Sequence, residues 1–113
     1  MSADNPNPKD KISSDLVRED ASFADIVLQF VEGLDERLTQ MQEALNAEDL
    51  EALRRSAHQL KGSGGGYGYP VLTKRAAELE DFAKSGSLDH CEKTFAELKD
   101  LCSRVVVDEA AEG

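Results

Sequence analysis

The segment LEALRRSAHQLKGSG, residues 50–64, predicts a helix and indicates the fold of the chain. Its apolar and small residues recur at steps of three or four, which places them on one side of a helix. Such a stripe must be buried against other elements, because an isolated helix of this length is marginal in water. The segment therefore predicts one member of a set of packed helices. The stripe consists of Leu50, Leu53, Ala57, Leu60 and Gly64.

The preceding segment, residues 22–45, carries a longer stripe of the same kind. Ser22 is suited to cap the start of a helix, and Asp25 complements the helix dipole three residues later. The segment predicts either one long helix or two collinear helices broken near Gly33. Residues 46–48 form a short link to the next helix. The stripe consists of Phe23, Ile26, Val27, Phe30, Val31, Leu34, Leu38, Met41 and Leu45.

Two more helices are expected after the glycine-rich run at residues 62–68. Pro70 suits the first turn of a third helix, and Gly86 suits its C-terminal end. Ser87 can cap a fourth helix. The expected inward positions are Leu72, Ala76, Leu79, Phe82 and Ala83 in the third helix, and Leu88, Cys91, Phe95, Leu98, Leu101, Cys102 and Val105 in the fourth.

Four amphipathic helices joined by short links predict an all-α fold, an antiparallel up-down four-helix bundle. The chain has 113 residues, enough for one such domain. Pro6, Pro8 and the lack of apolar periodicity predict a flexible N-terminal tail over residues 1–12. We expect the bundle over residues 13–108 and a frayed end over residues 109–113.

The charge of the chain excludes several classes of partner. Asp and Glu number 23 against 13 Lys and Arg, a net charge of -10. Nucleic acids and anionic membranes require a cationic surface, so neither is expected as a partner. The charge is uneven, because residues 52–77 contain five basic residues and no acidic one. That leaves eight basic and 23 acidic residues, a net -15, in the rest of the chain.

The cysteines and the apolar runs indicate a cytoplasmic location. Cys91 and Cys102 lie eleven residues apart in one expected helix, a separation of about 16 Å that excludes a disulfide between them. Free thiols are typical of a reducing compartment. The longest apolar runs, such as residues 105–107, are far too short to span a membrane.

His58 is the candidate site residue. It lies about 120° around the helix from the apolar stripe, so its ring should face solvent. Cations and glycines are expected around it on that face. Cations would stabilise an anion beside the ring, and glycines would let another protein approach closely. These neighbours are Arg54, Arg55, Lys61, Gly62 and Gly65.

A neutral imidazole nitrogen in such surroundings can accept a phosphoryl group. Hydrolysis is less expected, because no carboxylate lies within helical reach of His58 to orient the ring or to activate water. The glycine run matches no nucleotide-binding motif and follows no strand. We therefore expect a phosphoryl carrier, and not an enzyme with its own ATP-binding or kinase domain.

The string from Ala57 to Ser63, AHQLKGS, resembles the core of histidine-containing phosphotransfer (HPt) domains. Their pattern is a His followed by an apolar residue two positions on, Lys three on, Gly four on and then a small residue. The resemblance covers residues 22–107 and implies a four-helix bundle. It also implies that the helix carrying His58 continues through its glycines to about Tyr67.

The resemblance also implies roles for the matching residues. His58 would accept a phosphoryl group on its outward nitrogen from a receiver-domain aspartate or a histidine kinase, and pass it to another receiver. Lys61 would be the cation beside the phosphoryl group, and Gly62 would permit docking of the receiver. The expected partners are therefore a receiver domain or a hybrid histidine kinase. The chain would be a monomer without a cofactor of its own, and Mg²⁺ would be held by the receiver.

Other interpretations stay open. The chain could be a non-catalytic helical adaptor that docks receivers or kinases without being phosphorylated. Arg54 and Arg55 could pair with Glu51 or Glu48 and take no part in docking a partner. His90 stands next to Cys91, but adjacent helical residues point about 100° apart, so we interpret His90 as a surface residue and not as a metal ligand.

Overall fold

A computed structural model describes residues 10–107 of the chain. Within these residues there is no strand, and one isolated parallel bridge joins Ile12 to Val105. The chain forms the α-helices α1 (Asp15–Glu19), α2 (Ala24–Glu32), α3 (Leu34–Asn46), α4 (Leu50–Gly64), α5 (Pro70–Lys84) and α6 (Leu88–Arg104), with a 3₁₀ turn, η1 (Ala21–Phe23), before α2.

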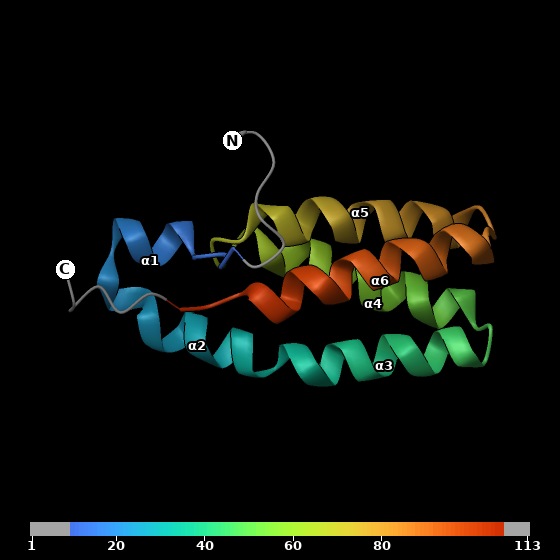
Figure 1. Cartoon of the computed structure of the whole chain (residues 1–113), viewed down its shortest axis with the longest axis horizontal. Coiled ribbons are helices and arrows are strands. Elements are labelled where there is room, and N and C mark those ends of the chain that lie inside the picture. Colours follow the sequence, from blue (N-terminus) through green and yellow to red (C-terminus); the bar gives the residue numbers. More distant parts are fainter. Residues whose placement is uncertain (1–9, 108–113) are drawn as a thin grey trace.

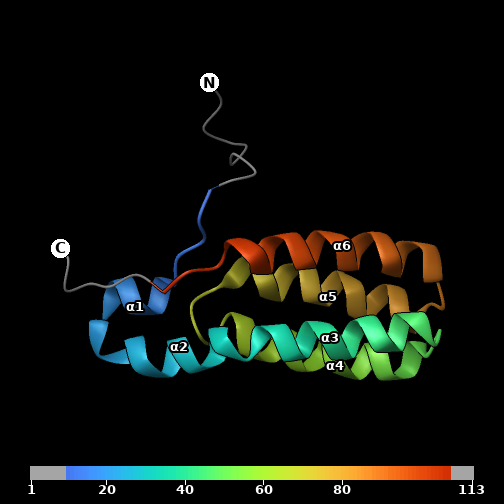
Figure 2. The same ribbon diagram turned by 60° about the horizontal axis from the view of Figure 1, so that its bottom comes forward.

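The helices α3, α4, α5 and α6 form an antiparallel four-helix bundle (Figures 1 and 2). Each of the pairs α3 with α4, α4 with α5, α5 with α6 and α3 with α6 packs side by side. The α2 helix extends the line of α3 beyond the end of the bundle, and α1 folds back beside it (Figure 2). The predicted all-α four-helix bundle is therefore confirmed.

The core is built mainly from the predicted apolar stripes, although Ile26 of the first stripe is exposed and the core also includes Val17. Leu53, Leu60, Leu79 and Leu98 come from three different helices and are fully buried. Tyr69 is also fully buried, and its hydroxyl donates a hydrogen bond of 2.7 Å to the carbonyl of Val106. None of the helices in residues 10–107 is both long enough and apolar enough to cross a bilayer.

The first long segment is divided at Gly33, which confirms two collinear helices. The backbone N–H of Gly33 still bonds to the carbonyls of Gln29 and Phe30, so helical hydrogen bonding continues up to the point where the two helices meet. The prediction that Ser22 caps this helix is wrong. The side chain of Asp20 accepts hydrogen bonds from both the N–H and the hydroxyl of Ser22, which holds Ser22 in η1.

The short helix α1 was not predicted, because five residues are too few for a periodic pattern. It docks on the loop after α4: the buried hydroxyl of Ser14 donates to the carbonyl of Tyr67, and the N–H of Asp15 donates to the carbonyl of Gly68. Gly68 has φ +94°, and a Cβ there would lie 2.3 Å from the Ser14 hydroxyl. Only glycine fits this position.

Ile12 lies at the predicted boundary between the N-terminal tail and the bundle. Ile12, the last residue of the expected tail, pairs with Val105 and packs against the core. Residues 1–9 of that tail and the expected frayed end at residues 109–113 lie outside the described residues. Ile12, which the prediction assigns to the tail, therefore contacts the bundle.

The ends of the later helices follow the predicted signals with one exception. Pro70 is the first residue of α5, and Gly86, with φ +76°, follows the end of that helix. The helix α4 ends at Gly64, three residues before the expected Tyr67, because the chain turns there to bring the N–H of Tyr69 to the carbonyl of Gly64.

Ser87 precedes α6 as predicted, but its hydroxyl bonds to the ring of His90 and makes no cap bond to the backbone. Cys91 and Cys102 are both free. Burial raises the pKa of the Cys102 thiol to about 12, aided by the negative charge of Asp35, so this thiol is protonated at neutral pH.

Candidate functional site

His58 lies in the middle of α4 with its ring turned outward, as predicted. Its side chain is 62% exposed, while Ala57 and Leu60 on the same helix are fully buried. The apolar stripe fixes the rotation of α4 in the bundle, and that rotation exposes the imidazole.

A carboxylate from the neighbouring helix contacts a ring nitrogen of His58. Glu80, on α5, is only 3% exposed, and its Oε2 is 3.0 Å from Nδ1 of His58. Its other oxygen, Oε1, is 2.8 Å from Nζ of Lys61. The prediction concerned only carboxylates within helical reach of His58, whereas Glu80 lies on another helix, 22 residues further along the chain. The inference that the ring lacks a carboxylate to orient it is therefore wrong.

Glu80 is ionised throughout the physiological range. The hydrogen bond from Lys61 is the largest cause that lowers the pKa of Glu80, to about 2, with smaller contributions from the His58 hydrogen bond and the charge of Lys84. Burial acts in the opposite direction and is overcome. An ionised carboxylate can only accept hydrogen bonds, so Nδ1 of His58 must donate. In the neutral ring the free lone pair is then on Nε2, the nitrogen that points away from Glu80.

The close contact between α4 and α5 places Glu80 under His58. A Cβ on Gly64 would lie 3.1 Å from Cβ of Leu72, so a larger residue would push the helices apart. The hydroxyl of Thr73 accepts a 2.6 Å hydrogen bond from the N–H of Gly65 and donates a 2.8 Å bond to the carbonyl of Lys61. One side chain of α5 thus binds the last turn of α4 on both sides of Gly64.

The predicted docking glycines differ in their surroundings. A Cβ added to Gly62 would meet nothing within 4 Å, so this position is an open part of the face that carries His58. A Cβ on Gly65 would lie 3.3 Å from the hydroxyl of Thr73. The packing of α5 therefore favours glycine at position 65 whether or not a partner docks there.

The two arginines before His58 form ion pairs on their own helix. Arg54 contacts Glu51 through two nitrogens, at 2.6 and 3.1 Å, and Arg55 contacts the same carboxylate at 3.5 Å. The hydrogen bond to Glu51 is the main reason that the pKa of Arg54 is raised, and the charge of Glu80 adds to it. The suggested pairing with Glu51 is confirmed, and a role of Arg54 and Arg55 in docking stays a prediction.

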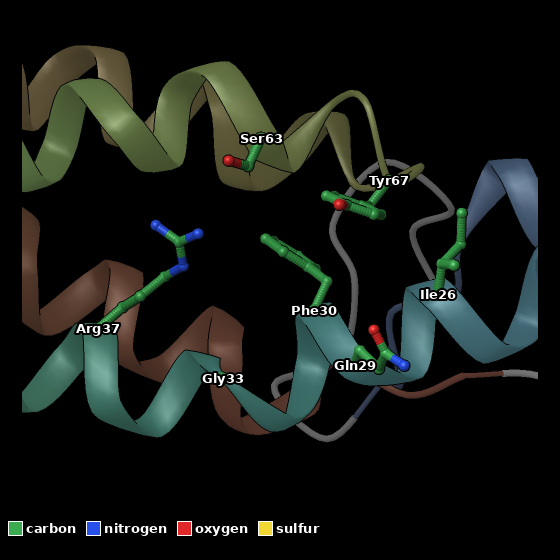
Figure 3. A pocket seen from close by; sticks show the side chains of 7 residues that line it. All are labelled: Ile26, Gln29, Phe30, Gly33, Arg37, Ser63 and Tyr67. Atoms are coloured by element: carbon green, nitrogen blue, oxygen red, sulfur yellow. The ribbon is translucent and has the colours of Figure 1, made fainter.

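A hollow of about 340 Å³ lies on the other flank of α4, between that helix, α2 and α3 (Figure 3). The rings of Phe30 and Tyr67 stack with their centroids 4.6 Å apart, and the guanidinium of Arg37 lies 5.8 Å from the centroid of Phe30. Ile26, at the edge, is 47% exposed. The sequence did not reveal this hollow, because Phe30 and Ile26 fit the apolar stripe of a core helix.

His90 lies away from this site. Its ring stacks on Phe82 with the centroids 4.6 Å apart, and its Nδ1 is 2.6 Å from the hydroxyl of Ser87. Among residues 10–107, no group of three or more His, Cys, Asp or Glu side chains is placed to hold a metal ion.

Comparison with known proteins identifies the family. A family model described as Hpt domain matches residues 25–107, which include α3 to α6, all of α2 except its first residue, and the whole site around His58. Comparisons with curated proteins and with solved structures gave no match. The match spans more than half of the chain and agrees with the helical fold, so the chain belongs to the family of Hpt domains.

Proposed function

We propose that this Hpt domain carries a phosphoryl group on Nε2 of His58, accepts it from a receiver-domain aspartate or a histidine kinase, and passes it to another receiver. Membership of the family implies a phosphotransfer role in a phosphorelay. The observation that carries the finer proposal is the hydrogen bond between the buried Glu80 carboxylate and Nδ1 of the exposed His58 ring.

The step needs no proton transfer at His58. The Nε2 lone pair forms a bond to phosphorus, and the bond from phosphorus to the aspartyl oxygen breaks with its electron pair on that oxygen. The ring then carries a positive charge and keeps its Nδ1 proton, which Glu80 accepts in a charge-assisted hydrogen bond. Transfer to the next receiver is the reverse step, in which neutral imidazole is the leaving group.

Lys61 supplies positive charge on the same face. Its side chain is 37% exposed and flexible, so the ammonium group can turn from Glu80 toward a phosphoryl group on His58. Its charge would offset part of the negative charge of that group. The remaining neutralisation would come from Mg²⁺ in the receiver. We place this exchange in the cytoplasm, between a receiver and a monomer of this chain.

Incubation with a receiver that carries labelled phosphate tests the proposal. The native chain should acquire label that is stable in base and labile in acid, and His58→Gln should acquire none. His90→Gln is the matched control, because it removes the other histidine of the chain, which lies outside the site. Label that persists in His58→Gln would overturn the assignment.

The adaptor hypothesis makes a different prediction in the same experiment. A non-catalytic adaptor would bind the receiver equally well in the native form and in His58→Gln, and would acquire no label in either. Binding and labelling are therefore measured together on the same preparations.

We also propose that the receiver covers the hollow beside α4. A stable interface buries about 800 Å² on each partner, a patch that is wider than a single helix. A receiver centred on Gly62 and His58 would therefore extend over Ser63 and the edge of α2 that carries Ile26. The exposed Ile26 and the guanidinium of Arg37 would meet apolar and acidic groups of the receiver, respectively.

Two substitutions on α2 test this docking face. Ile26→Asp should weaken receiver binding roughly tenfold or more, because it places a charge in an apolar contact. Leu28→Asp is the control, since Leu28 is 44% exposed but lies about 160° away around α2. The affinity is measured by titration calorimetry, with circular dichroism to check folding. Equal losses in the two variants, or none in either, would contradict the proposed face.

A further inference from the structure

Lys84 makes a third contact with the carboxylate under His58. It is the last residue of α5, and its Nζ is 3.7 Å from Oε2 of Glu80, the oxygen that faces Nδ1 of His58. Lys61 contacts the other oxygen. Glu80 is therefore shared by three groups, and Lys84 and His58 lie on the same oxygen.

This pair differs from an ordinary ion pair between helical residues four apart. The pair of Arg55 with Glu51 has the same spacing and a similar distance, 3.5 Å, but both of its side chains are more than half exposed. In the pair with Lys84 the carboxylate is 3% exposed. Its charge is poorly screened by water, so a cation beside Oε2 reduces the negative potential that Nδ1 of His58 experiences.

We infer that Lys84 is a positioning residue that acts through Glu80, by weakening the hold of this carboxylate on the Nδ1–H of His58. The inference rests on the proposed function, because its effect on phosphate requires that His58 carry the group. In the phosphorylated ring, Glu80 favours the cationic form that keeps the Nδ1 proton. Lys84 opposes this preference and so lengthens the life of the bond between Nε2 and phosphorus.

The chemistry follows from the leaving group. When a receiver aspartate attacks phosphorus, or when water attacks and releases a proton to solvent, the new P–O bond forms and the N–P bond breaks with its electron pair on Nε2. The cationic ring leaves as neutral imidazole, whereas a ring that has lost the Nδ1 proton would have to leave as an anion. A stronger hold by Glu80 therefore speeds loss of the phosphoryl group, and a cation beside Oε2 slows it.

Three variants and one small-molecule donor test the inference without a partner protein. The chain is phosphorylated with phosphoramidate, and the lifetime of phosphohistidine is followed by ³¹P NMR. Lys84→Gln should shorten the lifetime roughly two- to fivefold, the scale expected for a half-exposed lysine. It should also move the Nδ1 proton resonance of the unphosphorylated ring downfield. Lys84→Arg should restore the native lifetime, and Lys74→Gln, which removes an exposed lysine elsewhere on α5, should leave it unchanged.

The double variant separates action through Glu80 from direct action on phosphate. In a Glu80→Gln background, Lys84→Gln should have no further effect on the lifetime. A shortened lifetime in that background, or a native lifetime and Nδ1 resonance in Lys84→Gln alone, would overturn the inference. The Nδ1 resonance is read without phosphate, so it still tests Lys84 if receivers fail to label His58 and the proposed function is rejected.

Discussion

At the scale of single residues, the chemistry of the site depends on which ring nitrogen of His58 carries the proton. Glu80 decides this, because an ionised carboxylate 3.0 Å from Nδ1 requires a donor there. Without such a partner the imidazole would exchange between two neutral forms, of which only one has its lone pair on the exposed Nε2. The buried carboxylate therefore prepares the nucleophile before any phosphoryl donor arrives.

Glu80→Gln should slow phosphorylation of His58 by roughly ten- to a hundredfold, because a hydrogen bond to a charged group is typically worth about 1.5–3 kcal/mol. The rate is measured with phosphoramidate and with a phosphorylated receiver. Glu78→Gln is the control, since Glu78 is on the same helix but pairs with Arg75 at the surface. A native rate in Glu80→Gln would mean that the carboxylate does not prepare the ring.

At the scale of helices, the site depends on how closely α5 approaches α4. Thr73 binds the last turn of α4, and Gly64 leaves the space in which Leu72 packs. Both contacts occur within the two turns of α4 that follow His58. The glycines, which by propensity alone weaken α4, therefore allow the contact that brings Glu80 to the ring.

Two alanine substitutions in α4 should have opposite effects on stability. Gly64→Ala should destabilise the chain by about 1–3 kcal/mol, because the new methyl would lie 3.1 Å from atoms of Leu72 and Thr73. Gly62→Ala should stabilise it by up to about 1 kcal/mol, because alanine favours the helix and nothing lies within 4 Å. Urea denaturation measures both values.

The Gly62→Ala variant also separates the effect of a methyl group on helix stability from its effect on docking of the receiver. Gly62→Ala, although more stable, should accept phosphate from a receiver about tenfold more slowly, because the methyl enters the space that the partner needs. Its reaction with phosphoramidate should be unchanged. If receiver and phosphoramidate rates both stay native, Gly62 plays no part in docking.

The four long helices were predictable because each repeats its apolar pattern over many residues, and Pro70 and Gly86 have one dominant structural use. The helix α1 was not predictable from the sequence, because it is held in place by tertiary contacts such as the hydrogen bond from Ser14 to Tyr67. Within the site, the exposure of His58 followed from its own helix. The contact with Glu80 depends on how two helices pack, which no spacing within one segment reveals.

At the scale of the whole molecule, a segment rich in basic residues is followed closely by the buried carboxylate of Glu80. Residues 52–77 contain five basic residues and no acidic one, in a chain of net charge -10. Glu80 follows this segment closely, and its carboxylate contacts Lys61 within it and Lys84 beyond it. A receiver with acidic groups around its aspartate would meet mainly cations on this face. The buried carboxylate contacts Lys61 and Lys84 without exposing its own charge to solvent.

This arrangement couples Glu80 to the stability of the fold. Its pKa is about 2 in the folded chain, mainly through the Lys61 hydrogen bond, against an ordinary value of 4.5. A lowered pKa means that the folded state binds the proton more weakly than the unfolded state. The stabilisation is therefore complete above about pH 4.5 and is lost as the pH falls toward 2.

Urea denaturation between pH 7 and pH 2 should show this loss in the comparison of native chain with Glu80→Gln. The native chain should be the more stable at pH 7, and the difference between the two free energies of unfolding should shrink steadily below about pH 4.5, since Gln does not titrate. A difference between native and Glu80→Gln that stayed constant down to pH 2 would mean that Glu80 is not held ionised by Lys61 and His58, and the preparation of the His58 ring would then need another source.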